Sequence, residues 1–153
     1  LNNGALALGA AFQKINFLRD LEADFRALGR SYFPGVTVET FNEEQKEFLV
    51  ADIAADLIVA ANAIRLLPTD VRPAVSAAQF LFQELTTKVA ATPANVLITT
   101  RIRVSNPRKL VLVAKALLGE NYCNIYSVLR RNEISQITTE IPPIEYKTYL
   151  SRL

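Results

Sequence analysis

A stretch of twelve residues near the start of the chain, residues 13–24, constrains this sequence more than any other part. On a helix with about 100° per residue, Asn16, Asp20 and Asp24 fall on one stripe because each follows the previous one by four positions, and Gln13 joins them. Two carboxylates and a carboxamide that converge in this way cost free energy unless a cation or a solvated cavity lies in front of them. Their oxygen atoms suit a hard ion. Mg²⁺ fits best, since it takes one or two carboxylates and completes its shell with water and phosphate oxygens.

The spacing of these carboxylates alone does not decide their role. Carboxylates four residues apart on a helix are usually found on an ordinary solvated face. The apolar neighbours argue for burial on most sides of the helix, and they are Ile15, Phe17, Leu18, Leu21 and Phe25. We therefore predict a polar stripe on a largely buried helix, which requires a polar or charged partner.

A longer pattern surrounds the stripe. Residues 9–24, with the sequence GAAFQKINFLRDLEAD, are followed by GRSYFP at residues 29–34. This pattern resembles the second aspartate-rich motif of the squalene/phytoene synthase family, and is nearest to the bacterial phytoene synthase branch. The resemblance extends to about residue 118. It implies an all-α fold, a helical bundle of the isoprenoid synthase type that is present here in part.

The same resemblance implies an activity and a set of site residues. The activity is the head-to-head condensation of two prenyl diphosphates, with geranylgeranyl diphosphate giving phytoene, assisted by Mg²⁺ as the diphosphate departs. Asn16, Asp20 and Asp24 would bind the metal, and Asp20, Asp24 and Arg19 would be the catalytic residues. The residues expected to bind substrate are Gln13, Asn16, Arg19, Arg30 and Tyr32. For the two arginines an ordinary salt bridge is the alternative, Arg19 with Glu22 or Arg30 with Glu22 or Asp24.

The sequence also departs from the family pattern. Members carry two aspartate-rich helices that face each other, and we find no counterpart of the first one. Asp52 and Asp56 are four residues apart, but they lie downstream of the matched motif in a setting that resembles a later helix of the family, so we expect a structural or outward-facing role. We expect the chain to be the C-terminal half of such an enzyme, inactive unless a second chain or the missing half supplies the other helix. The rival interpretation is a non-catalytic helical binding or scaffold module.

Capping and proline signals predict where the helices lie. We expect a first helix from Asn2 or Asn3 to Gly29 and a second at residues 42–68, begun by a capping box of Asn42 and Gln45. A third helix, capped by Thr69 or Asp70, is expected to run to Pro93, followed by a short helix and one at residues 108–118. Gln79 and Gln83 share a face of the third helix that we expect to be exposed, the alternative being that they border the cavity. We assign residues 1–118 to the synthase-like domain and 119–153 to an unrecognised tail, with an alternating pattern at 134–141 that would suit a short strand.

Charge and composition restrict the environment of the protein. The net charge is +2 and the basic residues are spread along the chain, which argues against a nucleic-acid partner. One cysteine fits a reducing compartment, and no apolar run is long enough to span a bilayer. We expect a cytoplasmic protein with transient contact to the inner membrane face, from which lipid substrates arrive. The densest basic stretch, residues 101–109, could attract an anionic substrate or an anionic membrane, although solvated helix ends are the default interpretation.

Overall fold

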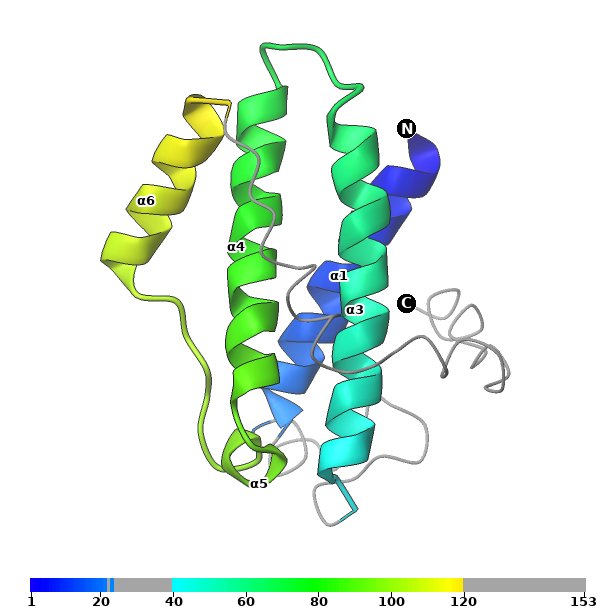
Figure 1. Cartoon of the computed structure of the whole chain (residues 1–153), viewed down its shortest axis with the longest axis vertical. Coiled ribbons are helices and arrows are strands. Elements are labelled where there is room, and N and C mark those ends of the chain that lie inside the picture. Colours follow the sequence, from blue (N-terminus) through cyan, green and yellow to red (C-terminus); the bar gives the residue numbers. More distant parts are fainter. Residues whose placement is uncertain (22, 24–39, 120–153) are drawn as a thin grey trace.

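The computed structural model describes residues 1–21, 23 and 40–119, and every regular element within them is a helix, so the predicted all-α class is confirmed (Figure 1). The elements in chain order are α1 (Asn2–Arg19), α3 (Glu43–Ile64), α4 (Arg72–Ala91), α5 (Ala94–Leu97) and α6 (Asn106–Leu117). The tail at residues 120–153, with its predicted strand, lies outside the described residues.

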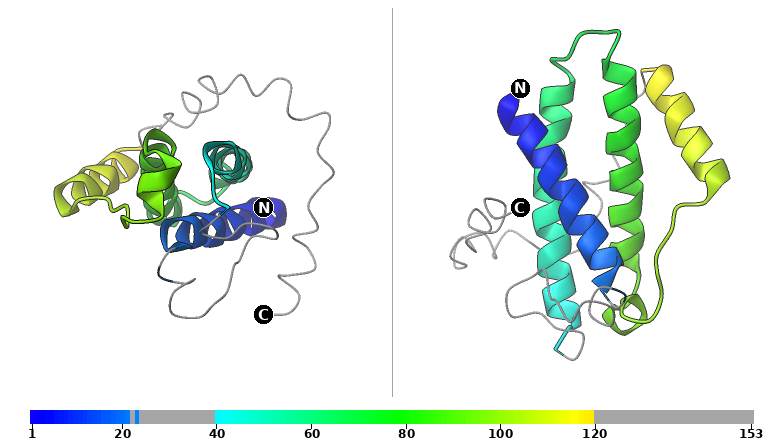
Figure 2. Two further views of the ribbon diagram at one scale, coloured as in Figure 1. Left: turned by 90° about the horizontal axis from the view of Figure 1, so that it is seen from below. Right: turned by 180° about the vertical axis from the view of Figure 1, so that it is seen from behind.

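Three long helices form the body of the bundle. The helices α3 and α4 run side by side, α1 crosses behind them, and α6 stands on the outer side of α4 (Figures 1 and 2). A continuous core joins them. Its fully buried residues on α1 are Ala11, Ile15 and Leu18, which recur at helical spacing and pack towards Ile53 and Leu57 of α3. This spacing fixes the rotation of α1, and thereby the direction of its polar stripe.

Most helix boundaries follow the sequence signals. The capping box of α3 is confirmed: Asn42 Oδ1 accepts from the backbone N–H of Gln45, and the Gln45 side chain accepts from the backbone N–H of Asn42. Pro107 lies in the first turn of α6, and Gly119 follows that helix with a positive φ of 71°, the left-handed conformation that glycine adopts readily.

Two predicted caps are wrong. Leu1 holds the N-cap position of α1 and Val71 that of α4, in both cases without a side-chain hydrogen bond. The asparagines at positions 2 and 3 therefore lie within α1. The helix α1 ends at Arg19, whereas we expected it to reach Gly29, a position outside the described residues.

The prediction for Gln79 and Gln83 is also wrong, because both side chains are buried in α4. The amide of Gln79 donates to the backbone carbonyl oxygen of Leu57 in α3 at 2.7 Å. A buried amide group is tolerated when it finds such a partner. Here the partner belongs to a neighbouring helix, which the sequence pattern does not show.

Candidate functional site

The two flanks of α1 face different surroundings. Its core residues place Lys14 on the flank towards α3, and Phe12, Asn16 and Arg19 on the flank towards α4 and the segment before α6. The side chains of the second flank border a polar pocket of about 670 Å³. Asn16 of the predicted stripe therefore borders a cavity, whereas Lys14, which is not part of the stripe, faces α3.

Asp20, the central residue of the predicted motif, is held by two arginines. Arg19 Nη2 lies 2.7 Å from Asp20 Oδ2 and its Nε donates to Oδ1 at 3.1 Å. Arg101 Nε lies 2.8 Å from Oδ1, and its Nη2 donates to Oδ2 at 3.3 Å. Both carboxylate oxygens are thus engaged. Partial burial by itself would raise the pKa of Asp20, but the hydrogen bonds and positive charges of Arg19 and Arg101 outweigh it and keep this pKa below its ordinary value.

The polar pocket next to this cluster carries a strong excess of positive charge. Its lining contains four basic side chains and no acidic one. The basic residues are Arg19, Arg101, Arg103 and Lys109, and the neutral polar residues are Asn16, Ser105 and Asn106. Arginine presents paired donors that match phosphate oxygens, so the arrangement suits a phosphorylated ligand.

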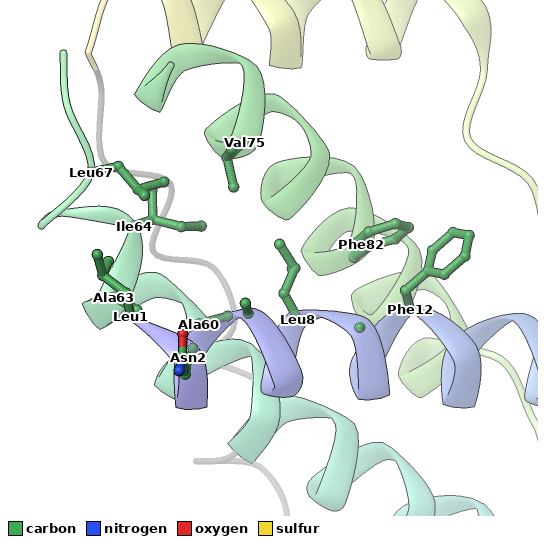
Figure 3. Close-up of a pocket in the computed structure, with 13 residues that line it drawn as sticks. Leu1, Asn2, Leu8, Phe12, Ala60, Ala63, Ile64, Leu67, Val75 and Phe82 are labelled. Carbon is green, nitrogen blue, oxygen red and sulfur yellow. The ribbon is translucent and has the colours of Figure 1, made fainter. Parts of the chain in front are cut away.

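A second pocket, of about 470 Å³, lies towards the N-terminal end of α1 and is almost entirely apolar (Figure 3). Helices α1, α3 and α4 all contribute to it, with residues such as Leu8, Ile64 and Val75. Phe12 and Phe82 border both pockets, and their ring centroids lie 4.8 Å apart with planes inclined by 57°. This aromatic pair therefore forms a shared wall between a cationic pocket and an apolar one.

On the opposite flank of α1, Lys14 binds the other pair of aspartates. Its Nζ lies 2.5 Å from Asp52 Oδ2 and 2.7 Å from Asp56 Oδ2. Burial would lower the pKa of Lys14, but the two carboxylates raise it overall. Burial raises the pKa of Asp56 and outweighs the opposing effect of Lys14. The structural role expected of Asp52 and Asp56 is confirmed, since they join α3 to α1.

The remaining predicted site residues are only partly accounted for. Gln13 is partly buried on α1 and is not among the residues that border either pocket. Asp24, Arg30 and Tyr32 lie outside the described residues, as does Glu22, the expected alternative partner of Arg19. The observed partner, Asp20, was not anticipated.

For a metal, the described residues supply two oxygen-bearing side chains on successive turns of α1, Asn16 and Asp20. Residues 1–21, 23 and 40–119 contain no group of three or more acidic, histidine or cysteine side chains that could hold a metal ion together. A carboxamide and a carboxylate beside a pocket for phosphate oxygens still fit the donor chemistry of Mg²⁺, which uses few protein ligands when a substrate phosphate completes the shell.

Sequence reasoning identified the segment 101–109 as basic but did not assign its residues to the site. Arg101 meets Asp20 across 81 positions of the chain. The segment's unusual charge density was the available signal, and it could not reveal which acidic residue or pocket the arginine reaches.

No helix in the described part of the chain is long and apolar enough to cross a membrane. No curated protein and no solved structure matches the chain significantly. The family model for squalene/phytoene synthase matches residues 2–108, which covers α1 to the start of α6 and all the residues that line the two pockets except Leu1 and Lys109. The family consists of helical prenyltransferases of isoprenoid biosynthesis that join prenyl diphosphates head to head, and they generally depend on a divalent metal. The chain belongs to the squalene/phytoene synthase family.

Proposed function

We propose that this chain binds a prenyl diphosphate across the two pockets, as part of a head-to-head prenyl transferase whose substrate is geranylgeranyl diphosphate and whose product is phytoene. The observation that carries the proposal is the joining of a cationic pocket to an apolar one at Phe12 and Phe82. A prenyl diphosphate is divided in the same way as the two pockets, because it carries a highly charged head on a hydrocarbon chain. The diphosphate head would lie in the polar pocket, and the hydrocarbon chain of the ligand would pass the rings of Phe12 and Phe82.

The arginines at Asp20 have a specific part in this proposal. In the free chain, Arg19 and Arg101 use their donors on the Asp20 carboxylate. A diphosphate that enters the polar pocket carries oxygens of higher negative charge than those of Asp20. The same guanidinium groups can bind these oxygens. The arginines would then turn to the diphosphate, and the oxygens of Asp20 would become available.

Released in this way, Asp20 would bind Mg²⁺ together with Asn16 and Asp24. The ion, when bound, supplies positive charge that stabilises the departing diphosphate. Arg19 and Arg101 would stabilise the same charge directly through their donors, where it accumulates as the carbon–oxygen bond breaks. Arg30, Tyr32 and Gln13 remain predicted substrate-binding residues, and Asp24 a predicted catalytic one.

We further propose that the chain alone binds this ligand but does not turn it over. Both carboxylates of its other aspartate pair contact the Lys14 ammonium, so we do not expect that pair to serve as a second metal site. A second chain or segment that carries an aspartate-rich helix would complete the enzyme. We also propose that the protein is cytoplasmic and contacts the membrane transiently, since its substrate is a lipid.

Calorimetric titration with geranylgeranyl thiodiphosphate, an analogue that resists ionisation, tests the proposal. We expect Mg²⁺-dependent binding that Arg101→Ala weakens by about tenfold or more, the effect of losing a charge-assisted contact. Arg65→Ala is the matched control because Arg65 is exposed and borders neither pocket. Equal affinities of the two variants would refute the assignment of the polar pocket. If the corresponding free alcohol, which has no diphosphate, bound as tightly as the thiodiphosphate, the result would favour the scaffold interpretation.

A further inference from the structure

The helix α6 is anchored to the bundle by one narrow face. Leu112 and Ala116, one turn apart, are buried against α4. Arg108 Nη2 lies 2.9 Å from Glu84 Oε2 of α4 and holds the start of the helix. These contacts fix which side of α6 points away from the protein.

The outward side of α6 is apolar. Leu110 is 72% exposed, Leu117 is 69% exposed, and Val113 between them is 44% exposed. Their spacing of three and four residues places them on one face, and Leu118 at 76% exposure extends it. In Figures 1 and 2, α6 stands outside α4. The exposed face lies on the side of α6 away from Leu112 and Ala116, which are buried against the bundle. A soluble surface rarely carries so many apolar side chains together, and such a patch marks an interaction site.

The segment that carries the apolar face is rich in basic residues. Residues 98–119 contain five basic residues and no acidic one, although the whole chain has 17 basic and 15 acidic residues. The basic residues are Arg101, Arg103, Arg108, Lys109 and Lys115. Arg101 and Arg108 are ion-paired with Asp20 and Glu84, whereas Arg103 and Lys109 are exposed and can reach head groups. A helix with an apolar face and basic flanks matches a bilayer that carries anionic lipids: the apolar side chains enter the boundary of the acyl chains, and the cations lie among the head groups.

We propose that α6 binds the surface of a membrane that contains anionic lipids, by inserting Leu110, Val113 and Leu117. The occupant is a lipid surface because charge complementarity favours it over a second copy of this chain, whose corresponding face would be equally basic. The segment that leads into α6 borders the polar pocket through Arg101 and Arg103, and α6 itself borders it through Lys109. Docking would bring this pocket close to the head groups.

The inference rests on the proposed function for its membrane contact and is independent of the proposed diphosphate site. Its test contains no substrate, so that the two proposals can fail separately. The probe is a vesicle of phosphatidylcholine with or without phosphatidylglycerol, and binding is measured by co-sedimentation of the full chain. We expect binding to the anionic vesicles that decreases with ionic strength.

A matched pair of double variants isolates α6. Leu110→Ser with Leu117→Ser should weaken binding to the anionic vesicles by about tenfold or more, because it removes the apolar surface that enters the bilayer. The control is Leu6→Ser with Leu66→Ser: these leucines are 73% and 71% exposed, border neither pocket, and lie outside α6. The control pair should bind as the parent chain does.

Three results would overturn the proposal. One is the absence of vesicle binding by the parent chain. Another is equal loss of binding in both double variants. The third is a dimer in solution, measured by light scattering, that the α6 variant dissociates without any change in vesicle binding, since the face would then bind a second copy of the chain.

Discussion

Replacement of Lys14 by methionine tests how α1 is held in its orientation. The variant keeps the length and much of the packing of the side chain but removes the charge between Asp52 and Asp56. The Lys14 side chain is 15% exposed, and those of Asp52 and Asp56 are 32% and 24% exposed. Removing one partner of a buried ion pair costs about 3–5 kcal/mol, and partial exposure reduces this, so we expect a loss of about 2 kcal/mol in the free energy of unfolding.

Urea denaturation measures this loss. With a slope of about 2 kcal/mol per molar urea, the midpoint should fall by about 1 M. The triple variant Lys14→Met, Asp52→Asn, Asp56→Asn should recover most of the stability, because it leaves no unpaired charge. A loss below about 0.5 kcal/mol in Lys14→Met, or no recovery in the triple variant, would refute the structural role of these ion pairs.

The pH dependence of the same variant provides a second check. Burial already raises the pKa of Asp56 above its unfolded value, so its contribution to stability falls as the pH rises through that raised pKa. Without Lys14 this pKa rises further, because the opposing charge is lost. The destabilisation of Lys14→Met should therefore be smaller near pH 4 than near pH 7. Lys14 has a pKa raised in the folded chain, so its stabilising effect in the parent is present below its unfolded pKa and lost at strongly alkaline pH.

Two further variants test the site, and a third tests the packing of α4 on α3. In the complete enzyme, Asp20→Ala should lower turnover far more than Asp52→Ala, and equal losses in a diphosphate-release assay would mean that the wrong aspartate pair was chosen. Phe82→Ala should weaken the binding of a prenyl thiodiphosphate by about tenfold or more, because the ring would contact the hydrocarbon part of the ligand. The affinity for inorganic diphosphate should stay within about twofold. Equal weakening of both ligands in calorimetric titration would contradict this. Gln79→Ala should lower the free energy of unfolding by about 2 kcal/mol, since it removes the hydrogen bond that joins α4 to the Leu57 carbonyl of α3 and opens a gap between the two helices. An unchanged urea midpoint would show that this bond contributes nothing.

The parts of the fold that depend on neighbouring residues could be read from the sequence. The capping box at Asn42, the proline near the start of α6 and the apolar spacing of α1 each act within one or two turns, and the structure has all three. The parts that depend on distant residues could not. Arg101 meets Asp20, and Gln79 meets the Leu57 carbonyl, only because helices pack side by side, and no local pattern encodes that meeting.

The same distinction applies to the candidate site. The motif directed attention to Asn16, Arg19 and Asp20, which the structure places at or beside one pocket. It did not show that Asp20 is held by two arginines. Nor did it show that the second aspartate pair binds Lys14, since that requires the relative rotation of α1 and α3.

A crystal structure of the chain soaked with Mg²⁺ and geranylgeranyl thiodiphosphate tests the central claim most directly. The account predicts diphosphate oxygens within hydrogen-bond distance of Arg19 and Arg101, the hydrocarbon chain beside Phe12 and Phe82, and Asp20 turned from the arginines towards the ion. A diphosphate bound elsewhere, with both arginines still on Asp20, would contradict it.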